Sequence, residues 1–204
     1  MKLSKYVAMA KRESFCRVIH VEGSGVWLGL RGAFYRATGL PDIRGEDQAK
    51  AVLDIPDKAF GKMFFEEAKA ESESNIYGVD MTPGAPNEQP ATELDMQVEF
   101  RGIGATALVC EDGELVFYNS ALTAPISDVM KESDYIQTVI RTAANGAKVI
   151  VIKDGFEPLA AIMPVKILGK QFMQALYELE NLCAGQYEKE SGGNKPDGET
   201  GIDE

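Results

Sequence analysis

Two short segments of this chain share the pattern Pro-x-Lys-x-x-Gly-Lys-x-Phe, and each directly follows an apolar run. The first spans Pro56 to Phe64 after Val52–Ile55, and the second spans Pro164 to Phe172 after Ala161–Met163. Proline suits the first turn of a helix, where its missing N–H costs nothing. A repeat of this kind indicates that one structural unit occurs twice. We therefore expect two similar halves, with a chance match of two helix starts as the alternative.

Apolar spacing predicts four helices. In the first, Leu3, Tyr6, Val7 and Ala10 share one face. The predicted helices span Leu3–Arg12, Pro56–Ala70, Asp134–Ala144, and a last stretch from Pro164, or a few residues later, to about Cys183.

Short apolar runs bounded by glycine-containing turns predict strands between these helices. The expected strands are Phe15–Val21, Val26–Leu30, Ala33–Ala37, Ala49–Ile55, Met96–Phe100, Ala105–Cys110, Glu114–Tyr118, Val149–Ile152 and Leu159–Met163, with a short one at Ile76–Val79. The sequence therefore predicts an α+β fold.

The composition changes at residues 71–94, which are rich in serine, glycine and proline. This segment is predicted to connect a first half at 1–70 with a second half at 95–184. Residues 185–204 carry many glycines and acidic side chains, which predicts a disordered acidic tail.

The formal net charge of −11 argues against a simple basic nucleic-acid binder. Cys16, Cys110 and Cys183 are scattered, which favours free thiols in the cytoplasm. His20 is the single histidine and is interpreted as a strand residue, so no metal site and no cofactor are expected. No apolar run is long enough for a membrane span, and the first residues do not resemble a signal peptide.

Each predicted helix carries or adjoins a few lysine or arginine residues, while many of the aspartate and glutamate residues lie in the connector and the tail. Such segregation suggests a positive face on an acidic protein, whereas the plain alternative is solvated lysines. The candidate DNA-binding residues are Lys2, Lys5, Lys11, Arg12, Lys58, Lys62, Lys69, Arg141, Lys148, Lys166 and Lys170.

Four segments carry a family resemblance. Val52–Phe60 looks like the strand-then-helix entry of a bacterial clamp domain, and Tyr135–Ile140 is similar to the last helix of a clamp. Lys148–Ile152 and Pro158–Lys166 are similar to its two closing strands. On these residues the chain resembles the DNA sliding clamps, which are ring-shaped processivity factors of DNA replication. The sequence repeat requires a helix that begins at Pro164, whereas the clamp resemblance places the end of the last strand there. The repeat and the resemblance therefore cannot both hold in full at this position.

The resemblance implies two halves of antiparallel sheet with helices on one face, and a ring closed by oligomerisation. It implies a non-catalytic protein that encloses duplex DNA without reading its sequence and that tethers a polymerase-type partner through a short peptide. An alternative is a non-enzymatic interaction protein of a phage or mobile element that does not contact DNA. An enzyme would have to use carboxylates such as Glu111, Asp112 and Asp154, which lie in predicted turns.

Overall fold

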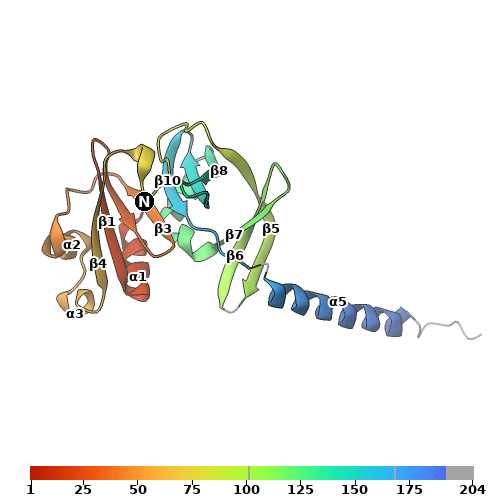
Figure 1. Cartoon of the computed structure of the whole chain (residues 1–204). Coiled ribbons are helices and arrows are strands. Elements are labelled where there is room, and N and C mark those ends of the chain that lie inside the picture. Colours follow the sequence, from red (N-terminus) through yellow and green to blue (C-terminus); the bar gives the residue numbers. More distant parts are fainter. Residues whose placement is uncertain (101, 168, 192–204) are drawn as a thin grey trace, which may run out of the picture. The chain divides into compact units, whose positions relative to one another are not determined.

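The computed structural model describes residues 1–100, 102–167 and 169–191, in two compact units that divide after Val165 (Figure 1). The helices are α1 (Leu3–Glu13), α2 (Gly45–Leu53), α3 (Asp57–Phe60), η1 (Glu73–Asn75), η2 (Ser120–Ile126), α4 (Ser127–Glu132) and α5 (Lys170–Ser191). The strands are β1 (Phe15–Val21), β2 (Gly25–Gly29), β3 (Ala33–Ala37), β4 (Phe64–Ala70), β5 (Gln89–Phe100), β6 (Ile103–Cys110), β7 (Leu115–Asn119), β8 (Ile136–Thr142), β9 (Lys148–Asp154) and β10 (Glu157–Ile162).

All the strands of the described chain belong to one mixed sheet in the first unit, so the predicted α+β class is confirmed. Their order is β4-β1-β2-β3-β10-β9-β8-β5-β6-β7. The pair β1–β4 is parallel, and the other pairs are antiparallel. Near the middle of the sheet, β3 and β10 join two three-stranded meanders: β1-β2-β3 follows α1, and β8-β9-β10 follows α4.

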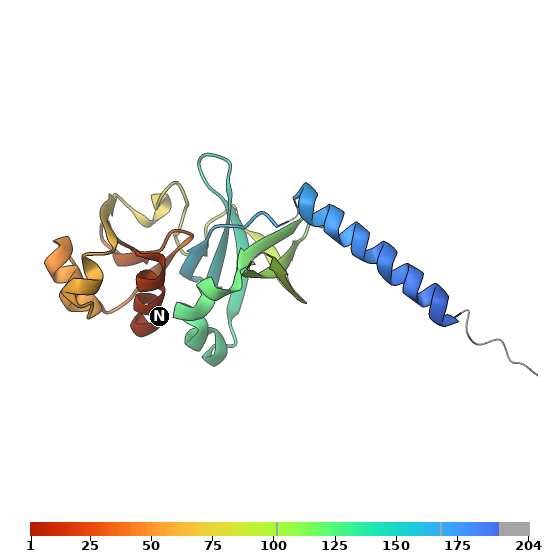
Figure 2. The ribbon, with the colours of Figure 1, turned by 90° about the horizontal axis from the view of Figure 1, so that it is seen from below.

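The central strands of the sheet are buried on both sides. We call one side the helix-side core, where Tyr6 of α1, Leu53 of α2, Phe60 of α3 and Ile126 of η2 pack in one cluster with strand residues such as Ile150. Figure 2 shows α1 beside η2 and α4, and Tyr35 on β3 donates a hydrogen bond to the Leu122 carbonyl in η2 at 2.7 Å. These helices therefore share one side of the sheet.

The other side is the connector-side core, which residues 76–81 cover. Ile76, Val79 and Met81 are fully buried there with Trp27 and Val151. Alternate residues of a strand point to opposite faces, so a strand in this position must be apolar throughout. The unbroken run Val149–Ile152 of β9 follows from this demand, because neighbouring residues of the run enter different cores.

The helix α1 and its first strands form as predicted. The α1 prediction and those for β1 and β3 agree with the structure within one residue. The Tyr6 hydroxyl donates to the Gly29 carbonyl at 2.9 Å and so ties the buried face of α1 to β2. The helix ends at Ser14, which has φ 50°, and the Ser14 N–H donates to the carbonyls of Ala10 and Lys11.

Two predictions in the first predicted half are wrong. The predicted strand Ala49–Ile55 is largely the helix α2, because Ala49 and Leu53 are one helical turn apart and both reach the helix-side core. The predicted helix Pro56–Ala70 ends at Phe60, and Phe64–Ala70 forms β4. Pairing with β1 outweighs the local helical pattern, and this partner lies far away in the sequence.

Three further predictions fail: a helix of the second predicted half, the structural repeat and the length of the connector. The predicted helix Asp134–Ala144 is the strand β8, paired along its length with β9, so the likeness of Tyr135–Ile140 to a clamp helix is also wrong. The two segments of the sequence repeat adopt different structures: the first holds α3 and the start of β4, whereas the second becomes helical only at Lys170. The predicted connector is shorter, because β5 begins at Gln89.

The second unit begins at Lys166, and its described part consists mainly of α5. The predicted last helix therefore exists, but it begins later and ends at Ser191. The first part of the predicted disordered tail, residues 185–191, belongs to α5, so the prediction is wrong there. Residues 192–204 of the predicted tail lie outside the described residues. Among the described helices, none combines the length and the apolar character that a membrane span requires.

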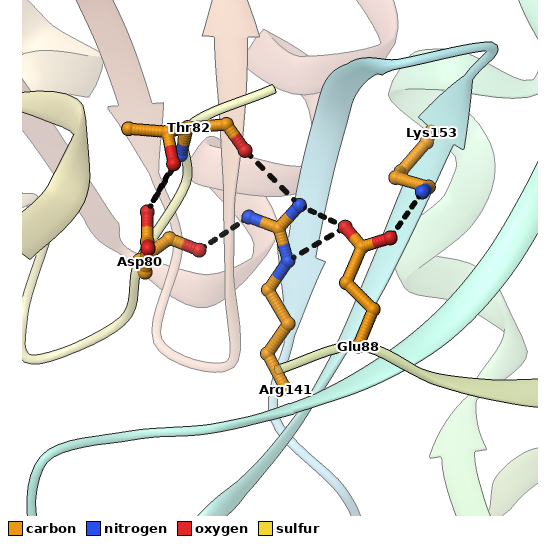
Figure 3. A network of polar contacts seen from close by, with 5 residues as sticks. All are labelled: Asp80, Thr82, Glu88, Arg141 and Lys153. Carbon is orange, nitrogen blue, oxygen red and sulfur yellow. Dashed lines mark hydrogen bonds and ion pairs between the residues drawn. The ribbon is translucent and has the colours of Figure 1, made fainter. Parts of the chain in front are cut away.

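A buried ion network holds the connector against the sheet (Figure 3). Arg141 of β8 is 2% exposed and donates to the carbonyls of Asp80 and Thr82 and to the carboxylate of Glu88. Lys153 of β9 reaches the second oxygen of Glu88. Burial alone would raise the pKa of Glu88, but the hydrogen bonds from Lys153 and Arg141 outweigh it and hold that pKa below its ordinary value.

Replacing Arg141→Met is expected to destabilise the protein strongly. The change leaves Glu88 Oε1 and two connector carbonyls without their donor, while Lys153 keeps its contact with Glu88 Oε2, and breaking a buried ion pair costs about 3–5 kcal/mol. Urea denaturation gives the free energy of unfolding. Lys148→Met is the control, because it removes an ion pair with Glu114 that is partly open to water and should cost at most about 1 kcal/mol. Equal losses in the two variants would contradict a stabilising role for the network.

The network also predicts how stability depends on acid. The pKa of Glu88 is lower in the folded state than its ordinary value of 4.5. The ionised Glu88 therefore stabilises the fold fully at pH values above about 4.5, and this stabilisation is lost as the pH falls through the lowered pKa. Glu88→Gln should therefore be less stable than the original chain at pH 7, and the gap should narrow in acid. Urea midpoints measured from neutral pH downward test this, and a gap of constant size would contradict it.

Candidate nucleic-acid interface

The structure distributes the candidate DNA-binding residues over both units. They lie just before α1 or on it (Lys2, Lys5, Lys11, Arg12), on or after α3 (Lys58, Lys62), on strands (Lys69, Arg141, Lys148) and at the start of the second unit (Lys166, Lys170). A cation that already pairs with a carboxylate has less charge to offer a phosphate, so ion pairing divides this set.

Two of the lysines on the α1 side are paired. Lys5 Nζ lies 2.6 Å from Asp128 Oδ1 and 2.7 Å from Ser127 Oγ, and Lys2 Nζ lies 3.0 Å from Asp128 Oδ2. Hydrogen bonds from Lys5 and then Lys2 lower the pKa of Asp128 to about 2. Lys2 and Lys5 therefore hold α4 beside α1 in this structure.

The strand residues of the set are also engaged. Arg141 was predicted on a helix with its charge toward DNA, but the guanidinium is buried in the network of Figure 3, so this prediction is wrong. Lys148 pairs with Glu114, which raises the pKa of the lysine. Neither side chain offers an unpaired charge.

Three of the predicted lysines meet around one hollow. Lys11, Lys58 and Lys62 line a cavity of about 450 Å³ together with Ser14, Pro56, Ala59 and Met63. We call this the lysine pocket. Lys11 comes from the last turn of α1, and the other two come from the segment that holds α3, so the pocket joins parts of the chain that are distant in sequence.

The backbone positions these lysines through short turns. The carbonyl of Pro56 accepts hydrogen bonds from Ala59 at 2.8 Å and Phe60 at 2.9 Å, which forms the single turn of α3. Beyond it, the Phe64 N–H donates to the Ser14 carbonyl at 3.0 Å and fixes the start of β4 against the end of α1. The same contact brings Lys62 to the side of the molecule where α1 ends.

The positive charges of the lysine pocket are not neutralised by described carboxylates. Within the residues that the structure describes, Lys11, Lys58 and Lys62 make no ion pair, and neither does the exposed Arg12 beside Lys11. The carbonyls at a helix C-terminus favour nearby cations, which suits Lys11 and Arg12. Ammonium groups on flexible stems can bind the oxygens of phosphates from several directions. The pocket is therefore suited to a polyanion.

Lys69 lies apart, on a second polar surface. It lines a hollow of about 260 Å³ with His20, Asp42, Arg44 and Glu67. His20 Nδ1 is 3.0 Å from Asp42 Oδ1, and His20 Nε2 is 3.3 Å from Glu67 Oε1. Hydrogen bonding from Arg44 is the largest influence that lowers the pKa of Asp42.

Sequence reasoning identified His20 as a strand residue, which is confirmed, but missed its two carboxylate neighbours. The parallel register that sets His20 opposite Lys69 places Glu67 nearby, and no local sequence signal reveals this register. Lys166 and Lys170, in the second unit, are exposed and form no ion pair with any residue that the structure describes.

Two of the three carboxylates that the enzyme alternative names accept hydrogen bonds within the fold. Asp112 Oδ1 accepts a hydrogen bond from the Glu114 N–H at 2.9 Å, and Asp154 Oδ1 accepts one from Ser133 Oγ at 2.6 Å. In the described chain, no three histidine, cysteine or acidic side chains are grouped so that they could hold a metal ion. The lysine pocket is thus the main candidate site.

Comparisons with known proteins do not add to this picture: no family model, no curated protein and no solved structure matches the chain.

Proposed function

We propose that this protein is a non-catalytic, DNA-associated protein of the sliding-clamp type, which tracks duplex DNA without reading its sequence and tethers partners to it. The observation that carries the proposal is the lysine pocket, whose three ammonium groups make no ion pair with described residues on a protein of net charge −11. A specific gathering of cations on an acidic protein implies an anionic partner.

The architecture supports the same proposal. A helix followed by a three-stranded meander occurs twice, and the two meanders meet at the pair β3–β10. The helices α1, α2, α3 and η2 pack on one side of the resulting sheet, which is the arrangement that a clamp needs if its helices are to line a hole, whereas the short η1 lies with the connector on the other side. The two halves of the proposal are thus α1 with β1–β3 and α4 with β8–β10, and they replace the halves drawn from the sequence repeat.

The ends of the sheet provide a way to close a ring. The strands β4 and β7 lie at opposite ends, and each pairs with one neighbouring strand. The Val165 N–H also donates to the Phe117 carbonyl of β7 at 2.7 Å, so β7 offers only the part of its outer edge that Val165 leaves open. An unpaired strand edge is a template for another strand. In the proposed ring, β4 of one copy pairs with β7 of the next. A ring retains DNA by topology, so loose contacts from Lys11, Arg12, Lys58 and Lys62 suffice, with Lys69, Lys166 and Lys170 as further contributors.

Charge reversal in the lysine pocket tests the DNA contact. The triple variant Lys11→Glu, Lys58→Glu, Lys62→Glu should lose retention on nicked circular DNA, because repulsion replaces three phosphate contacts. At salt concentrations low enough for the variant still to bind, the slope of log affinity against log salt concentration should decrease in magnitude by about 0.9 for each phosphate contact removed. Gel shift and gel filtration of DNA complexes measure both effects.

The matched control keeps the positive charge: Lys11→Arg, Lys58→Arg, Lys62→Arg should bind as the original chain does. Retention that survives the glutamate variant would refute the role of the pocket. The ring is tested separately, because a clamp slides off linear DNA and stays on a circle. Equal retention on both would refute the topological mechanism while leaving the DNA contact intact.

A second candidate function is a non-enzymatic interaction protein that does not contact DNA. The exposed apolar side chains of α5 favour it, because Met173, Leu176, Leu179 and Leu182 are each more than two-fifths exposed. Unpartnered apolar surface on a helix is typical of protein recognition. Absence of DNA binding by the unmodified chain at low salt would select this function.

A further inference from the structure

A hollow of about 570 Å³ lies at the edge of the sheet where β1 and β4 end and β2 begins. Its floor is one row of side chains across three neighbouring strands, because Lys69 is the register partner of His20, which in turn is the partner of Val26. Register partners share one face of a sheet. Leu40 and Asp42, from the segment after β3, complete this side of the lining. We call it the His20 hollow, and its volume is usual for a site that holds a small molecule.

The imidazole in the floor is fixed by neighbouring carboxylates. His20 Nδ1 lies 3.0 Å from Asp42 Oδ1, and the buried Nε2 lies 3.3 Å from Glu67 Oε1. Asp42 also accepts a hydrogen bond from Arg44 Nε at 2.6 Å, and Glu67 Oε2 accepts one from the Gly45 N–H at 2.9 Å. These contacts hold the segment before α2 against β1 and β4. The hollow is therefore shaped in advance by side chains that have partners of their own.

Three other charged side chains that line the hollow, Lys69, Glu22 and Glu71, form no ion pair with any residue in the described part of the chain. Lys69 and Glu71 are two residues apart, which is about 7 Å along an extended chain. The Glu22 N–H donates to the Ala70 carbonyl at 3.2 Å, which places Glu22 beside the end of β4 as well. One cation and two anions therefore surround the same opening.

The hollow also has an apolar wall. Val26 is buried, and the half-buried Leu40 packs against the helix-side core. An aliphatic group that lies over these two side chains is removed from water together with them, which favours its binding. A ligand that matches the whole hollow thus has an aliphatic part and charges of both signs.

We propose that the His20 hollow binds a small zwitterion, an α-amino acid with an aliphatic side chain. The carboxylate of the ligand pairs with Lys69, its ammonium group pairs with Glu71 and Glu22, and its side chain packs on Val26 and Leu40. A simple anion provides no donor for the two glutamates, and a simple cation provides no acceptor for the lysine. Groups that lose water without gaining a partner weaken binding, so neither of these ligands fits as well.

This site is distinct from the proposed DNA contact. None of the described residues that line the His20 hollow also lines the lysine pocket. The inference goes beyond the proposed function and does not depend on it.

The experiment titrates the full chain with L-leucine and follows binding by the chemical shifts of backbone amides near His20. Two probes separate the charges, because isocaproate is leucine without the ammonium group and leucinamide is leucine without the carboxylate. Each should bind about 10-fold more weakly than leucine, since a hydrogen bond to a charged group is lost. Glycine, which has no side chain to pack on the apolar wall, should also bind about 10-fold more weakly.

Variants assign each end of the ligand to its partner. Lys69→Met should weaken leucine about 10-fold and leave leucinamide unchanged, because leucinamide has no carboxylate to lose a partner. The double variant Glu22→Gln, Glu71→Gln should weaken leucine and leave isocaproate unchanged. Lys131→Met is the matched control, because this exposed lysine of α4 lies outside the hollow and its loss should not affect leucine.

Four results would overturn the inference. The first is that leucine does not bind, and the second is that Lys69→Met binds it as well as the original chain does. A preference for isocaproate would assign the hollow to an anion, and a preference for leucinamide would assign it to a cation. The readout contains no DNA, so failure here leaves the proposed function standing, and loss of DNA binding leaves this site untouched.

Discussion

Burial of the central strands on both sides is the constraint on which the rest of the structure depends. The central strands β3, β10 and β9 can be apolar at successive positions only because helices cover one face and residues 76–81 cover the other. The connector carries polar residues as well, and it stays in place because Arg141 and Lys153 meet Glu88 and the connector carbonyls. The lysine pocket lies at the edge of this core.

Ion pairing determines which of the basic residues are available to a ligand. Lysines and arginines are easily counted in a sequence, but their partners depend on tertiary structure. Lys5 and Arg141 both looked like surface cations, and both are engaged with carboxylates from segments more than fifty residues away. Among the cations of the described chain that make no such pair, three line one pocket. This selection, rather than the total charge, gives the proposed interface its specificity for an anion.

Much of the fold could be predicted where local pattern and tertiary environment agree, as in α1, β1 and β3. The strand β8 shows why other elements could not. Ile136, Val139 and Ile140 have the spacing of a helical face, but in a strand buried on both sides they simply alternate between two cores. The sequence identifies the lysines of the pocket as candidate DNA-binding residues, but it does not predict that they lie together. Lys62 approaches Lys11 only because Phe64 bonds to Ser14. Nothing in the sequence indicates that contact.

The strand β4 is the outermost in its half of the sheet, and its single bonded neighbour runs parallel to it. Edge position and parallel pairing both make a strand easier to detach than an interior antiparallel one. The first residue of β4 is Phe64. The two residues before it, Lys62 and Met63, line the lysine pocket. Occupation of the lysine pocket would thus be thermodynamically linked to local order: a polyanion bound there would reduce fraying of β4, and fraying of β4 would weaken the binding of that ligand.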